Sequence, residues 1–257
     1  MIVINGAVVP LVSWGFAQAG VRVVLFPWAL LAAAVLAHVL TFRWVDARGW
    51  RSVRLDAGAF EARAVAGAAL LGAAAIALPV AALIATGWLR IETGPPGSSL
   101  AAALSIGLFL APAALWEEMM FRGYAFAALE EWWGSAAALV VTSTVFGLVH
   151  FANAGASAAS IAVVVLAGVM LGGVLLVTRS LYAAFAAHLA WNWTLAGVFH
   201  SAVSGVPFAT PDYRMVDAGP DWATGGVWGP EGGVAAVTGL GAATIYLYAR
   251  HRRRGES

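Results

Sequence analysis

The chain has 257 residues, of which 61% are hydrophobic and 11% are charged, and its mean hydropathy is +0.84. Globular domains carry roughly 25% charged residues, so this composition excludes an ordinary water-soluble domain. The net charge of +1 gives no case for binding nucleic acid, and none is expected as a partner. Because cysteine is absent, disulfides, thiolate metal sites and a cysteine nucleophile are excluded as well.

Apolar runs of about 20 residues, the length that crosses the hydrocarbon core of a bilayer, recur along the chain. They predict an all-α, polytopic transmembrane bundle with about seven spans, at 21–42, 63–88, 99–131, 135–151, 156–178, 181–203 and 234–249. Pro112 lies inside the long third segment, where we expect it to kink the helix or to mark a restart. The stretch 1–16 is a candidate eighth segment, either interfacial or re-entrant.

The arginines predict the orientation of these spans. Four lie in the loop after the first span and four more in the tail 250–257. With seven spans, this loop, the tail and the turn at Arg179 share one side, and the positive-inside rule places that side in the cytoplasm. We therefore expect a protein of a bacterial cytoplasmic membrane, in contact with membrane lipid, with its N-terminus outside and its C-terminus inside.

The chain shows no internal repeat and no soluble segment, which predicts a single membrane domain, 1–257. The connection 204–233 is rich in glycine and proline and is expected to be an external loop, and 250–257 a basic cytoplasmic tail. The motifs described next occupy a core at about 100–203.

Ionisable residues inside apolar helices cost about 2.5–3.5 kcal/mol each on insertion scales, so each is a candidate functional residue. The first cluster is Glu117, Glu118 and Arg122. On a helix, Glu118 and Arg122 are i, i+4 neighbours and can pair, whereas Glu117 lies about 100° further round. One carboxylate can thus be neutralised while the other faces a cavity as a base. A salt bridge at a cytoplasmic helix end is the alternative interpretation.

Two further clusters follow in later apolar segments. His150 ends the run that starts near residue 135, and His188 and Asn192 lie four residues apart, on one helix face. Each has a structural alternative, namely a histidine bonded at a helix end or a hydrogen-bonded pair between helices. Together the three clusters supply a carboxylate, two imidazoles and an amide, which can activate a water molecule and hold an oxyanion.

We also expect particular positions for residues outside the three motifs. At least one of three tryptophans beside the motifs is expected to line a cavity: Trp116, Trp191 and Trp193. Three glycines are expected to let a neighbouring helix approach closely: Gly168, Gly172 and Gly173. Three histidines are expected to be structural or interfacial: His38, His200 and His251. Three glutamates are expected to be solvated: Glu130, Glu131 and Glu231.

The ordered trio of motifs resembles the CPBP family of intramembrane endopeptidases, which comprises CAAX proteases and bacteriocin-processing proteins and is also called Abi. The family pattern is Glu-Glu-x-x-x-Arg, then Phe-x-x-x-His, then His-x-x-x-Asn. Here it reads Glu117-Glu118 with Arg122, Phe146 with His150, and His188 with Asn192. The resemblance covers about 100–203 and includes every motif position.

The resemblance implies an endopeptidase that cleaves a membrane-associated protein or peptide. It implies that Glu117 activates water beside His150, that His188 and Asn192 stabilise the oxyanion, and that Arg122 pairs with Glu118. Either no cofactor is required, or a divalent metal such as Zn²⁺ is held by Glu117, His150 and His188. Asparagine is a poor zinc ligand and a good oxyanion donor, which favours the metal-free mechanism.

Two alternatives to an enzyme stay open: a non-catalytic membrane scaffold or immunity-type protein, and a proton-coupled transporter that uses Glu117 and the histidines as a relay. The enzyme is favoured because a structural pair needs only Glu118 and Arg122. One geometric difficulty remains. Straight helical rods leave about 10 Å of mismatch in depth between the motif residues, unless the fourth span is short or tilted or the third helix breaks near Pro112.

Overall fold

The computed structural model of the protein describes residues 24–255. The candidate segment 1–16 and the start of the first predicted span lie outside these residues. Each of the seven predicted spans corresponds to a helix: α2 (Phe26–Trp44), α3 (Ala62–Ala85), α4 (Ser99–Arg122), α5 (Tyr124–Val149), α6 (Ala158–Thr178), α7 (Leu181–Trp193) and α9 (Val234–Gly255). The helical fold class is thus confirmed for the described residues.

Four helical stretches in the described part of the chain are long and apolar enough to cross a membrane: Phe26–Trp44, Ala62–Ala85, Ser99–Ala152 and Ala158–Thr178. The third has 54 residues, because α4 and α5 follow one another almost without interruption. The α7 helix has 13 residues and continues as a π-helix, Thr194–Val198, while α9 ends in the basic tail.

The break in the third predicted segment lies at Gly123 rather than at Pro112. Pro112 is inside α4, which continues to Arg122, so the expected restart there is wrong. Gly123 leaves the helical conformation with ψ −126°, and a second interruption follows inside α5 at Gly134, with φ 83° and ψ 165°. Only glycine adopts the backbone conformation at Gly134 without steric cost.

The junction at Gly123 is held by α2. The Nε2 atom of His38 accepts a hydrogen bond from the backbone N–H of Tyr124, the first residue of α5, at 3.3 Å. A Cβ atom at Gly123 would collide with His38 Nε2 and with the carbonyl of Met119. The structural role expected for His38 is therefore confirmed, and the residue fixes the point where α4 ends.

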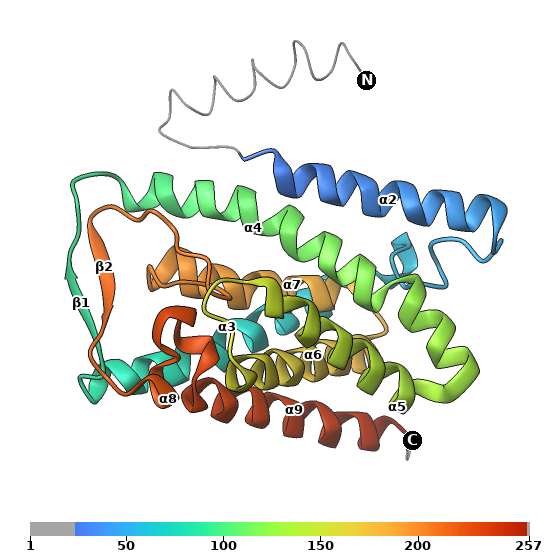
Figure 1. The fold of residues 1–257 in the computed structure, drawn as a ribbon. Coiled ribbons are helices and arrows are strands. Elements are labelled where there is room, and N and C mark those ends of the chain that lie inside the picture. The colour runs from blue at the N-terminus through green and yellow to red at the C-terminus, as the bar shows by residue number, and fades with distance from the viewer. Residues whose placement is uncertain (1–23, 256–257) are drawn as a thin grey trace, which may run out of the picture.

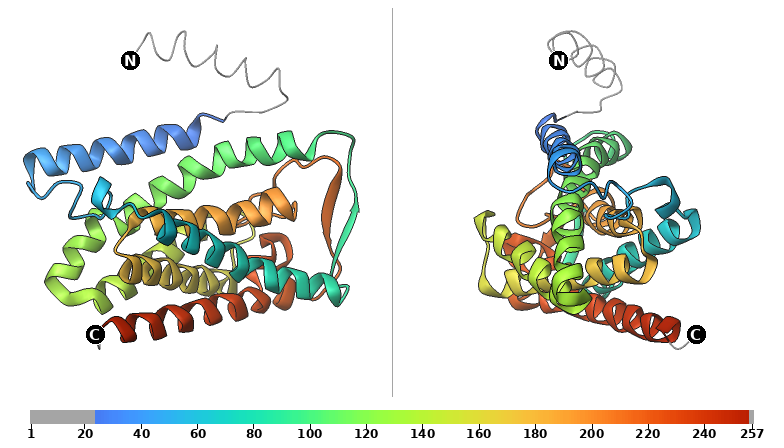
Figure 2. Two further views of the ribbon diagram at one scale, coloured as in Figure 1. Left: turned by 180° about the vertical axis from the view of Figure 1, so that it is seen from behind. Right: turned by 90° about the vertical axis from the view of Figure 1, so that its right-hand side faces the viewer.

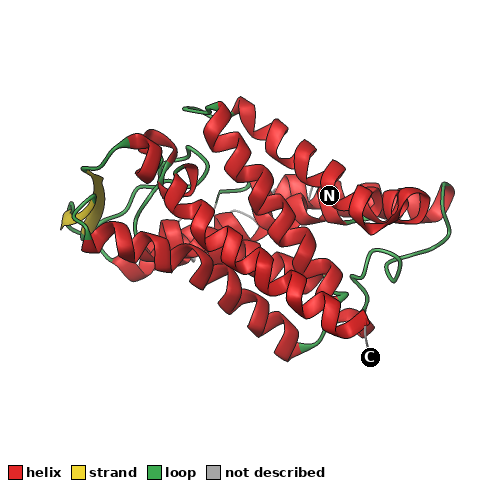
Figure 3. Cartoon of the chain, turned by 90° about the horizontal axis from the view of Figure 1, so that it is seen from below, coloured by secondary structure: helices red, strands yellow, loops and turns green. Residues whose placement is uncertain are grey.

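Two short strands depart from an all-α fold. They are β1 (Leu89–Thr93) and β2 (Tyr213–Asp217), which pair antiparallel with Arg90 opposite Val216. Figure 3 shows this small sheet at one end of the helical bundle. The strands come from the connections after α3 and before α9, so the predicted external loop 204–233 is an ordered segment that also contains α8 (Asp221–Thr224) and three residues of 3-10 helix at Pro230–Gly232.

The helices run side by side between two ends of the molecule (Figure 1). The sheet occupies one end, and the loop after α2 and the C-terminal part of α9 lie at the other (Figures 1 and 2). At that second end, the backbone N–H of Leu181 donates to the carbonyl of Arg54, and the Arg54 side chain pairs with Glu130 at 2.5 Å. The basic loop, the turn at Arg179 and the tail thus share one end, as the spacing of the spans predicts.

The α7 helix lies at the centre of the bundle. It packs against α3, α4 and α6, while α2 covers α4, and α9 packs against α3 and α6. The core around α7 includes Leu181, Ala184, Ala187 and Leu195, none of which is exposed. Polar side chains on α7 are therefore surrounded by other helices.

Candidate active site

The first motif lies on the last turns of α4, and its two carboxylates have different surroundings. Glu118 Oε1 accepts a hydrogen bond from Arg122 at 3.0 Å, and both side chains are completely buried. The Glu117 side chain is 20% exposed and lines a cavity between the helices. The predicted separation into a paired carboxylate and a free one is confirmed.

Arg122 makes two further contacts that fix its guanidinium. Its Nη2 atom donates to the carbonyl of Gly168 on α6 at 3.1 Å, and the guanidinium carbon lies 4.4 Å from the centre of the Phe146 ring. A Cβ atom at Gly168 would lie only 2.9 Å from Ser143 Cα, so glycine is required for the close approach of α5 and α6. The expected role of Gly168 in helix packing is confirmed.

Glu118 also holds His188, a contact that the spacing of the motifs does not predict. The Nδ1 atom of His188 lies 2.8 Å from Glu118 Oε1. If Nδ1 carries the proton in this bond, the opposite ring nitrogen, Nε2, is left toward Glu117, whose Oε2 lies 3.8 Å away. Glu118 thus orients the imidazole with respect to the free carboxylate.

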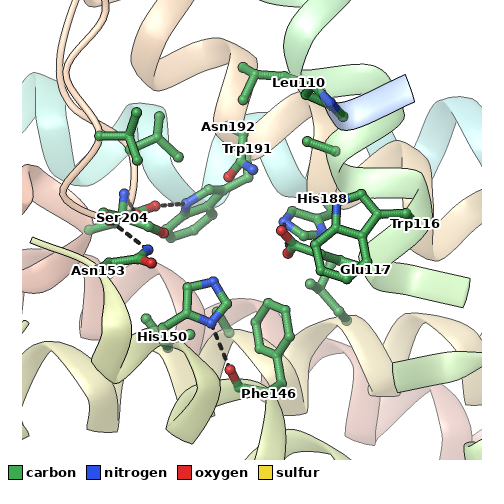
Figure 4. A pocket seen from close by; sticks show the side chains of 18 of the residues that line it. Leu110, Trp116, Glu117, Phe146, His150, Asn153, His188, Trp191, Asn192 and Ser204 are labelled. Atoms are coloured by element: carbon green, nitrogen blue, oxygen red, sulfur yellow. Dashed lines mark hydrogen bonds and ion pairs between the residues drawn. The ribbon is translucent and has the colours of Figure 1, made fainter. Parts of the chain in front are cut away.

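The second histidine reaches the same place from α5. His150 begins a turn of 3-10 helix directly after α5, and its Nδ1 lies 2.7 Å from the carbonyl of Phe146. The Phe146 ring packs edge-on against His150 and His188, with centroid distances of 4.8 and 5.9 Å. Figure 4 shows the remaining nitrogen of the His150 ring turned into the cavity.

These contacts resolve the mismatch in depth. The chain changes direction at Gly123 and again at Gly134 (Figure 1), so the later part of α5 returns across the end of α4. Phe146 consequently packs against Phe121, with ring centroids 5.2 Å apart, as well as against Arg122. His150, one helical turn after Phe146, therefore lies at the same depth as Glu117. No break of α4 at Pro112 is needed for this.

The four candidate side chains line one cavity of about 290 Å³: Glu117, His150, His188 and Asn192. In Figure 4, Glu117 and His188 lie on one side, with His150 and the Asn192 amide facing the space between them and Trp191. Trp116 and Trp191 also line the cavity, so the expectation for the tryptophans is confirmed. Trp193 instead donates its indole N–H to the carbonyl of Ala103 on α4.

The residues present do not form a metal site. Within residues 24–255, no three histidine, aspartate or glutamate side chains are grouped so that they could hold one metal ion. Glu117, His150 and His188 are thus not grouped as three ligands of one ion in the described structure.

A third carboxylate, Glu231, lines the cavity. The prediction that it is solvated is wrong, since it is only 6% exposed and accepts hydrogen bonds from Trp191 and Ser204. Ser204 and Asn153 line the same wall. Glu231 lies in a glycine-rich connection without helical periodicity, so no local pattern marks it. Of the other two glutamates, Glu130 pairs with Arg54 and Glu131 with Arg48 at the opposite end of the bundle.

The arrangement has the parts needed for hydrolysis. A free carboxylate faces an oriented imidazole at a distance that one bridging water molecule could span. A second imidazole and an amide border the same space, and an amide N–H can donate to a developing oxyanion. Apolar side chains of α2 and α4, including Phe26, Leu30 and Phe109, complete the cavity wall.

Comparison with known proteins agrees with the motifs. Residues 96–194 match the family model of Rce1-like type II CAAX prenyl endopeptidases. Searches of curated proteins and of solved structures gave no match. The matched segment contains Glu117, Glu118, Arg122, His150, His188 and Asn192, and the apolar helices together with this family indicate an integral membrane protein. The resemblance to the CAAX proteases is thereby confirmed for residues 96–194, which are similar to the Rce1-like family of type II CAAX prenyl endopeptidases.

Proposed function

We propose that the protein is an intramembrane endopeptidase that hydrolyses a peptide bond of a membrane-associated protein or peptide. One observation carries this proposal: the Glu117 carboxylate and the oriented His188 imidazole face each other, 3.8 Å apart, in a cavity that His150 and Asn192 also line. The separation is too long for a direct hydrogen bond and suits a water molecule held between the two groups. The family match to endopeptidases gives independent support.

In the proposed reaction, Glu117 accepts a proton from the water as its oxygen bonds to the carbonyl carbon of the substrate. The electron pair of the carbonyl moves to its oxygen, which accepts hydrogen bonds from the Asn192 amide and from an N–H of the His188 ring. When the carbon–nitrogen bond breaks, Glu117 returns the proton to the leaving amine. His150, whose Nδ1 is occupied by the Phe146 carbonyl, helps to orient the water.

No metal takes part in this proposal. Glu118 and Arg122 act on the reaction through His188, since Glu118 Oε1 contacts both side chains. The pair holds the imidazole in place and compensates the buried carboxylate. We expect a chelator to leave activity unchanged.

We further propose that the seven helices are seven membrane crossings of a single domain. The end with the basic loop, the Arg179 turn and the α9 tail is assigned to the cytoplasm, and the sheet end to the outside. From the family we adopt only that the substrate is a protein or peptide. We expect one end of it to be embedded in lipid, because the cavity is lined by apolar α2 and α4 residues beside the polar groups.

The test is a comparison of protein N-termini in membranes from cells that lack the native gene and express either the wild type or Glu117→Gln. The wild type should generate new N-termini that Glu117→Gln does not, with and without chelator. Glu131→Gln is the matched control, because Glu131 is 57% exposed and remote from the cavity. Identical N-termini in all three strains, with the biological role intact in Glu117→Gln, would support a scaffold or immunity-type protein instead.

A further inference from the structure

Glu231 is a buried carboxylate at the cavity wall that the proposed reaction does not use. It lies on the short 3-10 helix Pro230–Gly232, outside the segment that matches the endopeptidase family. Its residue is 6% exposed, and within the described part of the chain no arginine or histidine forms an ion pair with it. A buried carboxylate is costly unless neighbouring donors satisfy it, so its partners indicate why it is there.

Both oxygens of Glu231 accept hydrogen bonds. Oε2 accepts from the indole N–H of Trp191 at 2.8 Å, and Oε1 accepts from the Ser204 hydroxyl at 2.8 Å and from the Ser204 backbone N–H. The indole and the backbone N–H can only donate, so an acceptor is required at each oxygen. An ionised carboxylate meets this requirement, and a glutamine, with one oxygen and one NH2 group, does not.

The contacts continue beyond Ser204. The Ser204 carbonyl accepts a hydrogen bond from Asn153 Nδ2 at 2.9 Å, and Asn153 caps the 3-10 helix that begins at His150. We call the chain of bonds Trp191–Glu231–Ser204–Asn153 the outer network. It connects the segment that carries Asn192 with the segment that carries His150, on the side of the cavity away from Glu117 (Figure 4).

The orientation of Asn192 depends on its two neighbours. Trp191 is bonded to Glu231, and Trp193 donates its indole N–H to the Ala103 carbonyl on α4 at 3.0 Å. The regular α-helix ends at Trp193 and a π-helix begins at Thr194, so α7 is least regular just after Asn192. Two tryptophans anchored to different elements therefore fix the rotation of this part of α7.

We propose that Glu231 is a positioning residue, which through Trp191 holds the Asn192 amide at the place where the oxyanion forms. The proposal rests on the proposed function and adds to it a residue from the C-terminal segment. It also assigns a role to that segment, namely to complete the site built by the family-matched helices.

The experiment uses the full-length protein in liposomes and a peptide spanning a cleavage site found with the wild type. Glu231→Gln places an NH2 group against an N–H donor, and loss of a hydrogen bond to a charged group should lower kcat roughly 10- to 100-fold. KM should stay within about threefold of the wild type, because the interaction acts in the transition state. Trp191→Phe removes the indole N–H that bonds Glu231, together with part of the ring, and should also lower kcat.

A double-mutant cycle with Asn192→Ala distinguishes the positioning of Asn192 from a merely structural role of Glu231. If Glu231 acts through Asn192, then Glu231→Gln should reduce kcat much less in the Asn192→Ala background than in the wild type. A general loosening of the fold would reduce kcat by the same factor in both backgrounds, and that result would overturn the proposal. If Glu231→Gln fails to fold, the same cycle with Trp191→Phe in its place distinguishes the two roles.

Glu92→Gln is the matched control. It removes a carboxylate at the sheet end, where Glu92 pairs with Arg214 on the surface, and it should leave kcat unchanged. If the wild type is active and both Glu231→Gln and Trp191→Phe keep its kcat, the role of Glu231 is refuted and the proposed function is not. Failure of the wild type to cleave any peptide would refute the proposed function itself.

Discussion

Glu118, Arg122 and His188 show what spacing along a chain predicts and what it leaves out. The Glu118–Arg122 pair follows from an i, i+4 spacing on a helix, and the structure has it at 3.0 Å. The bond from His188 to Glu118 joins residues 70 positions apart, on helices whose packing the sequence does not fix. For the same reason the sequence does not predict the burial of Glu231, since its partner Trp191 is 40 positions away.

Arg122→Met should destabilise the protein strongly. It leaves Glu118 buried with no cation beside it, and breaking one partner of a buried pair costs about 3–5 kcal/mol. Thermal unfolding in detergent should show the loss. The double variant Glu118→Gln with Arg122→Met removes both charges and should unfold at a higher temperature than Arg122→Met alone. Wild-type stability in Arg122→Met would mean that the pair is not buried as described.

At the scale of elements, the helices were predictable and their interruptions were not. The ends of α3 and α6 lie within three residues of the predicted spans, whereas α4 ends at Arg122 and not at 131, and α7 ends at Trp193 and not at 203. The α4 helix passes through Pro112 and ends before Gly123, where a side chain would collide with the Met119 carbonyl and with His38 of α2. The contact with His38 is tertiary, so a local pattern cannot reveal it.

Gly168 offers a test of the contact between α5 and α6. In Gly168→Ala, the new Cβ would lie 2.9 Å from Ser143 Cα and Cβ. Overpacking of this kind typically costs 1–3 kcal/mol, and it would also displace the carbonyl that Arg122 bonds. Unfolding temperature and cleavage should both fall. Gly67→Ala on α3 is the control, because nothing lies within 4 Å of its added Cβ; equal effects of the two changes would contradict the packing argument.

For the whole molecule, the alternation of apolar helices and the arginine distribution predicted which segments share an end. The two-stranded sheet was not predicted. Its strands are separated by more than a hundred residues, and each is a short run within a connection. The ordered segment before α9 is likewise held by contacts with distant residues, since Glu231 accepts a hydrogen bond from Trp191 and the Ser204 carbonyl accepts one from Asn153.

The orientation can be tested with single cysteines, because the chain contains none. Ala57→Cys in the basic loop and His251→Cys in the tail should react with a membrane-impermeant maleimide only in inverted vesicles. Pro96→Cys at the sheet end should react only in right-side-out vesicles. All three positions are exposed in the structure. Labelling of Ala57→Cys and His251→Cys from opposite sides would exclude an even number of crossings between them.

The most direct test of the whole account is the cleavage rate of purified Glu117→Gln in liposomes, beside the wild type and Glu131→Gln. Loss of a general base should lower kcat about 10²- to 10⁴-fold, while the unfolding temperature, the Glu131→Gln control and the response to chelator stay unchanged. Cleavage by Glu117→Gln at the wild-type rate would contradict the assignment of Glu117 as the group that activates water.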